Sequence, residues 1–204
     1  GGFRVTPFLI ERVTDSQGVE VYAAAPEVAC ADCPGEPVAP QAISPANAFV
    51  MTDVMTDVIQ RGTATSAKSL GRSDLAGKTG TTNDRRDAWF VGFNADYVAA
   101  AWVGFDQERS LGDNEEGGRT ALPMWVGFME EALRDHPEHR LPEPPGVVRM
   151  WVDRSSGRPT SAGAGGAVFE AFLESHVPQA GSVLEADAVG AESVDPAAAD
   201  DTLF

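Results

Sequence analysis

The residue types best suited to chemistry in this chain stand side by side in the run Lys78-Thr79-Gly80-Thr81. A lysine supplies a positive charge, and a threonine hydroxyl can donate a hydrogen bond to a carboxylate. Gly80 has no Cβ, so the backbone of a bound molecule can come close to the chain at that point. Such a run suits a strand that holds a substrate by a carboxylate.

Strand patterns surround this run. Residues 74–83 precede two almost continuously apolar segments, residues 89–93 and 97–105. Continuous apolar runs of this length are typical of central strands that are covered on both faces. We therefore expect three neighbouring strands, with the lysine on the first of them.

Two helices are expected beside these strands. Ser44 is a suitable N-cap, Pro45 suits the first helical position, and Gly62 is expected to end this helix. A second helix should run from Thr120 to about Asp135. The order helix, three strands, helix predicts an α+β fold in which helices flank an antiparallel sheet.

The two ends of the chain carry hairpin patterns. Residues 3–23 alternate between apolar and polar types and break at residues 15–18, which predicts a hairpin with Gly18 in its turn. Residues 147–152, followed by a turn at residues 154–157, predict a short strand and a second hairpin.

The chain of 204 residues is strongly acidic, with a formal net charge of -16. Nucleic acid and anionic lipid headgroups both require a basic surface, so neither is expected as a direct partner. From residue 170 onward there are eight acidic residues and no lysine or arginine. We therefore predict a domain over residues 1–160 and a disordered, low-complexity acidic tail over residues 161–204.

The two cysteines lie close together as Cys30-Ala31-Asp32-Cys33 in a proline-rich connector. A zinc site would need two more ligands, and the three histidines are distant in sequence and not paired at ligand spacing. A redox motif of the thioredoxin type would stand at the start of a helix. A loop disulfide or two free thiols is therefore favoured over a metal or redox role, and no metal or cofactor is expected.

Other interpretations of the neighbouring residues are weaker. Gly77-Lys78-Thr79 ends a phosphate-binding loop motif, but that motif needs glycine where Arg72 stands and a helix after it. Residues 84–87, Asp-Arg-Arg-Asp, form either a patch for an anionic glycan or a self-paired turn, and the turn is favoured. The tryptophans of the apolar runs are expected in the core rather than as sugar platforms: Trp89, Trp102 and Trp125.

The chain resembles the C-terminal part of the transpeptidase domain of class A, bifunctional penicillin-binding proteins. Lys-Thr-Gly is one of the motifs of those enzymes and of the β-lactamases, beside a Ser-x-x-Lys motif. The resemblance extends from about residue 41 to residue 160, and the opening residues 1–8 are similar to the family's hairpin. The stretches that carry it are Ser44-Pro45-Ala46-Asn47-Ala48, Arg61-Gly62-Thr63-Ala64, Leu70-Gly71-Arg72-Ser73-Asp74-Leu75-Ala76-Gly77-Lys78-Thr79-Gly80-Thr81-Thr82, Asp87-Ala88-Trp89-Phe90-Val91-Gly92, Trp102-Val103-Gly104-Phe105-Asp106, Ser110-Leu111-Gly112, Glu116-Gly117-Gly118 and Leu122-Pro123-Met124-Trp125.

This resemblance implies a serine β-lactamase/transpeptidase-like fold and a peptidoglycan D,D-transpeptidase that cross-links stem peptides through an acyl-serine intermediate. Its substrates would be stem peptides ending in D-Ala–D-Ala, and β-lactams would acylate the same serine. Lys78 and Thr81 would be the catalytic residues of this chain. The substrate-binding residues would be Lys78, Thr79, Gly80, Thr81, Thr82 and Asn83. In particular, the Thr81 hydroxyl would bind the terminal carboxylate, and its N–H would serve the oxyanion hole.

The family's nucleophile belongs to a Ser-x-x-Lys motif, which is absent from these 204 residues. The chain also opens on Gly1-Gly2 without an initiator methionine. We therefore expect an inactive piece of a longer enzyme, whose parent is also a glycosyltransferase anchored at the periplasmic face of a bacterial inner membrane. Two alternatives remain: a D,D-carboxypeptidase or β-lactamase of the same superfamily, and a non-catalytic module that binds stem peptide or a partner protein.

Overall fold

The computed structural model describes residues 1–30, 33–34 and 37–179 of the chain. These residues fall into two compact units, which are described separately. The first comprises Gly1–Val148 with Ala171–Ser175, and the second comprises Arg149–Glu170 and the described residues from His176 onward.

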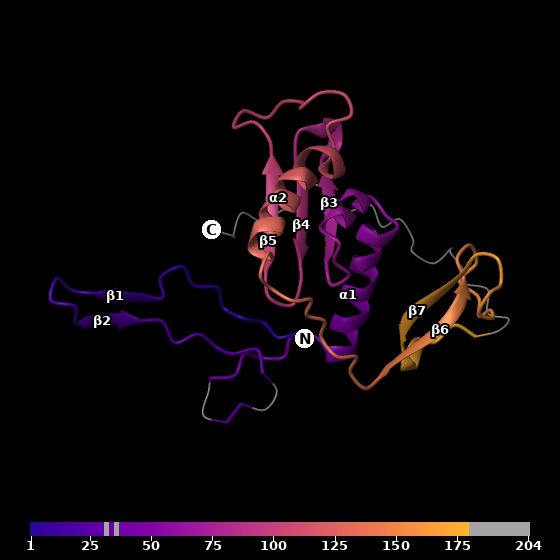
Figure 1. Ribbon diagram of the computed structural model, residues 1–204, viewed down its shortest axis with the longest axis horizontal. Coiled ribbons are helices and arrows are strands. Elements are labelled where there is room, and N and C mark those ends of the chain that lie inside the picture. Colours follow the sequence, from indigo (N-terminus) through magenta and orange to yellow (C-terminus); the bar gives the residue numbers. More distant parts are fainter. Residues whose placement is uncertain (31–32, 35–36, 180–204) are drawn as a thin grey trace, which may run out of the picture. The chain divides into compact units, whose positions relative to one another are not determined.

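A three-stranded antiparallel sheet forms the centre of the first unit (Figure 1). Its order is β3 (Ala76–Thr81), β4 (Ala88–Phe93) and β5 (Val98–Val103), which follows the order of the sequence. The register pairs Lys78 with Val91 and Val91 with Ala100. The three strands predicted from the sequence are confirmed, and β3 is an edge strand of this sheet.

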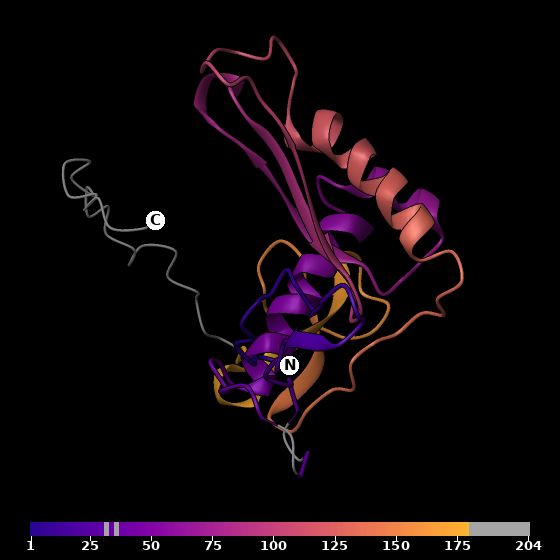
Figure 2. The same ribbon diagram turned by 90° about the vertical axis from the view of Figure 1, so that its left-hand side faces the viewer.

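The helices α1 (Pro45–Gln60) and α2 (Leu122–Ala132) supply the core that covers one face of the sheet. As predicted, the Ser44 hydroxyl caps α1 by accepting the Asn47 N–H at 3.2 Å. A π-helical turn, η3 (Gly117–Ala121), leads into α2, which Figure 2 shows lying along the sheet. The buried cluster consists of Ile59, Ala64, Ala67, Leu75, Phe90, Ala101, Ala121, Leu122, Trp125, Met129 and Leu133.

An aromatic contact fixes α2 on the central strand. Trp125, which is 1% exposed, meets Phe90 edge to face with ring centroids 4.9 Å apart. Its indole N–H donates to the Gly92 carbonyl at 3.2 Å. A Cβ on Gly92 would lie 2.6 Å from the Trp125 ring, so only glycine allows this approach.

The opposite face of the sheet is half-exposed, which corrects the expectation that both faces are covered within this chain. Trp89 and Trp102 are 40% and 42% exposed, so of the three tryptophans expected in the core only Trp125 is buried. Because side chains alternate along a strand, burial of Phe90 and Gly92 places Trp89 and Val91 on the other face.

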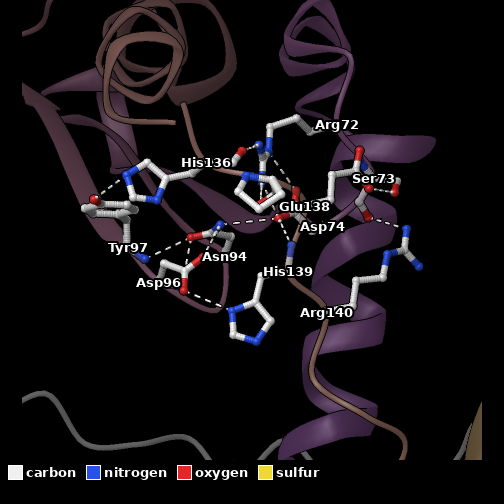
Figure 3. A network of polar contacts seen from close by, with 11 residues as sticks. Arg72, Ser73, Asp74, Asn94, Asp96, Tyr97, His136, Glu138, His139 and Arg140 are labelled. Atoms are coloured by element: carbon white, nitrogen blue, oxygen red, sulfur yellow. Dashed lines mark hydrogen bonds and ion pairs between the residues drawn. The ribbon is translucent and has the colours of Figure 1, made fainter. Parts of the chain in front are cut away.

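A polar network anchors the segment just before β3 (Figure 3). Arg72 forms two hydrogen bonds with the carboxylate of Asp74, at 2.9 and 2.6 Å. The same carboxylate accepts the His139 N–H at 3.0 Å and the Asn94 amide at 3.3 Å. Arg72 also donates to the His136 carbonyl at 2.7 Å, so the network ties the chain after α2 to the entry of β3.

The first hairpin and its connector are as expected, although the strands are short. Strands β1 (Arg12–Thr14) and β2 (Glu20–Ala23) pair around a turn in which Asp15 accepts the N–H groups of Gln17 and Val19. Cys30 and Cys33 are joined by a disulfide, which confirms the loop disulfide among the alternatives for this pair.

The C-terminal part is more ordered than the sequence suggested. Strand β6 (Val147–Asp153) pairs with β7 (Ala167–Leu173). The end of β6 also pairs with residues just after the turn, through an antiparallel bridge between Val152 and Pro159, so the predicted second hairpin is confirmed. The strand β7 and the short turn η4 (Glu174–His176) fall within the predicted tail of residues 161–204, so disorder is wrong for these residues. Residues 180–204 of that tail lie outside the described residues.

The Asp74 network predicts how stability depends on pH. The Asp74 carboxylate is fully buried, and this burial alone would raise its pKa. Hydrogen bonds from Arg72, the His139 N–H and Asn94 have the larger effect, so the pKa lies below the ordinary value of 3.8. Asp74 therefore contributes stability that is complete above about pH 4 and is lost as the pH falls through the lower folded pKa.

Asp74→Asn should lower the free energy of unfolding by about 3 kcal/mol at pH 7, because it leaves the Arg72 guanidinium without its charge partner. The deficit should shrink as the pH falls below about 4 and through the lowered folded pKa, because the wild-type carboxylate is then itself being protonated. Urea unfolding at pH 7 and at a pH below the folded pKa of Asp74 measures this difference in unfolding free energy. The substitution Asp106→Asn, at an exposed position, serves as the control. An equal deficit at both pH values would contradict this account of Asp74.

Candidate functional site

The candidate site follows the strand β3, whose side chains divide between the two faces of the sheet. Thr79 pairs with the buried Phe90, so Thr79 and Thr81 lie on the face that the helices cover. Lys78 and Gly80 share the opposite face with Trp89. The side chains of Thr79 and Thr81 thus leave the strand on one face, and that of Lys78 leaves it on the other.

The backbone of β3 presents Thr81 at an open edge. Thr82 donates its N–H to the Asp87 carbonyl at 3.1 Å, which marks this pair as hydrogen-bonded. Hydrogen-bonded and non-bonded pairs alternate along an antiparallel ladder, so the N–H and carbonyl groups of Thr79 and Thr81 point away from β4. Since β3 is an edge strand of the described sheet, the Thr81 N–H is directed to an edge that a ligand can approach.

The Lys78 ammonium lies at the same edge. Although its side chain starts on the exposed face, Nζ donates to the Thr79 carbonyl at 2.8 Å and to the Thr79 hydroxyl at 3.3 Å. That carbonyl points to the open edge, so the positive charge is held beside the backbone donors of the strand.

The Thr81 hydroxyl is oriented by a backbone group from another segment. It accepts the Gly117 N–H at 3.1 Å. A hydroxyl oxygen that accepts this bond keeps its own hydrogen available, so Thr81 can donate to a ligand carboxylate. Gly117 is buried against β3, and a Cβ on it would lie 2.2 Å from the Trp89 carbonyl oxygen and 2.6 Å from that of Gly80.

Thr82 is held by the turn that follows it. Its hydroxyl accepts the Asp87 N–H at 2.8 Å and lies 3.3 Å from the Asp87 carboxylate. The other oxygen of that carboxylate accepts the Trp102 indole N–H at 2.9 Å. Asp87 therefore joins the end of β3 to β5, and this link is the visible role of the Thr82 side chain.

The turn between β3 and β4 is strained and paired to the neighbouring loop. Asp84 and Arg85 have φ values of 59° and 53°, a left-handed conformation that costs energy for residues other than glycine. Arg86 pairs with Asp84 at 3.3 Å and with Glu108 at 3.0 Å, and Arg85 lies 3.7 Å from Glu116. The favoured self-paired turn is confirmed only for the pair Arg86–Asp84, because both arginines also pair with residues outside the turn. Asn83 begins the turn as an exposed residue.

The sequence missed three residues that touch the motif: Thr63, Asp87 and Gly117. The hydroxyl oxygens of Thr63 and Thr79 are hydrogen-bonded at 3.0 Å. All three belong to stretches that carried the resemblance. No spacing rule connects Thr63 or Gly117 to a strand residue 16 or 36 positions away, and Asp87 is five positions from Thr82. Among the described residues no group of three or more His, Cys, Asp or Glu side chains could hold a metal ion. None of the described helices is long and apolar enough to cross a membrane.

Comparisons with known proteins identify the family to which the chain belongs. Residues 1–121 match the model of the penicillin binding protein transpeptidase domain. Penicillin-binding protein 1A of Pseudomonas aeruginosa is 40% identical over 217 residues, covering 87% of this chain and 26% of the relative. That of Neisseria lactamica is 48% identical over 148 residues, covering 72% and 18%. The crystal structure of penicillin-binding protein 1A from Haemophilus influenzae matches with a TM-score of 0.79 and 32% identity, over 88% of this chain and 31% of that one.

The chain therefore belongs to the penicillin-binding protein transpeptidase family. The resemblance and the transpeptidase-like α+β fold expected from the sequence are both confirmed. The chain spans about a quarter or less of the length of these curated relatives.

The packing of Gly117 on β3 can be tested with two glycines. Gly117→Ala should lower the melting temperature by several degrees, because its Cβ would meet two backbone carbonyls of the sheet, which cannot move independently. Gly127→Ala in α2 is the matched control, since a Cβ there has nothing within 4 Å and alanine favours the helix. Thermal unfolding of both variants measures the difference. Equal melting temperatures would show that η3 does not pack on β3 as described.

Proposed function

We propose that this chain supplies the Lys-Thr-Gly side of a peptidoglycan D,D-transpeptidase active site. The observation that carries the proposal is the open edge of β3. There the Lys78 ammonium, the outward Thr81 N–H and the Thr81 hydroxyl, oriented by Gly117, lie along one strand. Acyl transfer from a peptide with a free C-terminus requires a positive charge near the site and two hydrogen-bond donors. One donor serves the developing oxyanion, and the other serves the terminal carboxylate.

In the proposed reaction a serine outside these 204 residues attacks the carbonyl carbon of the penultimate D-Ala of a stem peptide. The Thr81 N–H stabilises the negative charge that develops on the carbonyl oxygen. The Thr81 hydroxyl donates to the terminal carboxylate, and Lys78 keeps the site electropositive. Terminal D-Ala leaves with a proton on its nitrogen, and the acyl-serine ester then passes to the amino group of a neighbouring stem, which restores the serine hydroxyl. Thr79 supports the strand, Gly80 gives clearance, and Thr82 and Asn83 border the site.

The wider setting is also part of the proposal. The relatives that match over most of this chain bear the name penicillin-binding protein 1A. We accordingly propose a parent enzyme that also carries a glycosyltransferase activity and is anchored at the periplasmic face of the bacterial inner membrane. Stem peptides and β-lactams are its proposed ligands.

Penicillin labelling tests the proposal. The parent protein, which carries this chain together with a Ser-x-x-Lys segment, should be labelled by a fluorescent penicillin at the serine of that motif. The chain of residues 1–204 alone should remain unlabelled. A label mapped to a serine of the chain itself, or no label on the parent, would contradict the proposal. Transfer of the acyl group to water rather than to an amine would indicate a carboxypeptidase.

Variants of Thr81 in the parent test its carboxylate contact. Thr81→Val keeps the backbone N–H and the β-branched shape but removes the hydroxyl, so the second-order rate of acylation by penicillin should fall about ten- to a hundredfold. Thr81→Ser should recover most of the rate, and Lys78→Ala should be more severe than either change. If the Thr81→Val variant is acylated at the wild-type rate, the hydroxyl serves only the contact with Gly117.

A further inference from the structure

The loop between α1 and the following turn places a hydroxyl against the motif strand. Thr63 lies two residues beyond the cap of α1, and its Oγ1 is 3.0 Å from the Oγ1 of Thr79. Gly118 closes the other side of Thr79, because a Cβ built on it would be 3.6 Å from the Thr79 methyl group and 2.7 Å from the Thr63 carbonyl oxygen. The Thr79 side chain is thus bordered by two segments far from it in sequence.

This setting decides which way the Thr79 side chain turns. A threonine carries a hydroxyl and a methyl on the same carbon, and a χ1 rotation exchanges the positions of the two groups. The hydrogen bond with Thr63 favours the rotamer that keeps the hydroxyl where it is, whichever of the two oxygens donates. In that rotamer the Thr79 oxygen also accepts from the Lys78 ammonium at 3.3 Å.

The Lys78 side chain depends on such acceptors for its position. A lysine side chain has four rotatable bonds and loses substantial rotamer entropy when it is held in one place. In the described part of the chain, Nζ donates hydrogen bonds to the carbonyl and to the hydroxyl of Thr79. Rotation of Thr79 would replace one of these acceptors by a methyl group.

We propose that Thr63 is a positioning residue that holds the Lys78 ammonium at the open edge of β3 by fixing the side-chain rotamer of Thr79. The inference rests on the proposed role of Lys78 in acylation. It assigns a function in the reaction to a threonine that is 15 residues before Lys78 in the sequence and acts through the Thr79 side chain.

The test is penicillin acylation of the parent protein carrying Thr63→Val, which removes the hydroxyl and keeps the shape. The second-order rate should fall about three- to tenfold, the effect of one lost hydrogen bond between neutral groups. Thr63→Ser should restore most of the rate. Adding Thr63→Val to Lys78→Ala should cause no further loss, because the residue acts through the ammonium.

The matched control is Thr56→Val, since the Thr56 hydroxyl donates to the Thr52 carbonyl within α1 rather than to the motif strand. It should acylate at the wild-type rate, and Thr63→Val should melt at the same temperature as this control. A wild-type rate for Thr63→Val, or an equal fractional loss in the Lys78→Ala background, would overturn the inference. So would a drop in melting temperature that accounts for the lost rate. If wild-type parent is not acylated at all, the proposed function itself fails, and the inference fails with it.

Discussion

The structure depends on holding an edge strand in place without a second neighbouring strand. The strand β3 gains ladder hydrogen bonds from β4 on one side only, and its other edge is the one that a ligand would use. An edge of this kind is normally a liability, because its unpaired groups can bind other chains. Contacts to segments distant in sequence compensate for the missing neighbour at both ends and in the middle of the strand.

At the entry of β3 the compensation is electrostatic and buried. Asp74, with a fully buried side chain, is satisfied by a guanidinium, a backbone N–H and an amide, so its charge costs little to bury. At the exit the contacts are hydroxyl and backbone bonds, from Gly117 to Thr81 and between Thr82 and Asp87. The buried network holds the entry of the strand in place, while the exit carries the groups that we propose bind the ligand.

The sequence predicted local elements well because their signals are local. The cap at Ser44 and the three strands follow from residues that are neighbours along the chain. It misjudged Trp89 and Trp102, because an apolar run indicates burial but does not say what lies above each face. It also assigned Ala167–Leu173 to an acidic tail, because composition outweighed a short apolar pattern that becomes a strand only when β6 is beside it. The candidate site shows the same division: Lys78 and Thr81 follow from a motif, whereas Thr63 and Gly117 are recognisable only once the chain is folded.

We propose that the open edge of β3 binds the ligand through Thr81, and a crystal structure of the parent protein acylated by a penicillin would test this proposal. The ester carbonyl oxygen should lie about 3 Å from the Thr81 nitrogen, and the penicillin carboxylate should accept a hydrogen bond from the Thr81 hydroxyl. The Gly117 N–H should still be bonded to that hydroxyl. An adduct whose carbonyl and carboxylate both lie away from β3 would show that Thr81 does not bind the ligand.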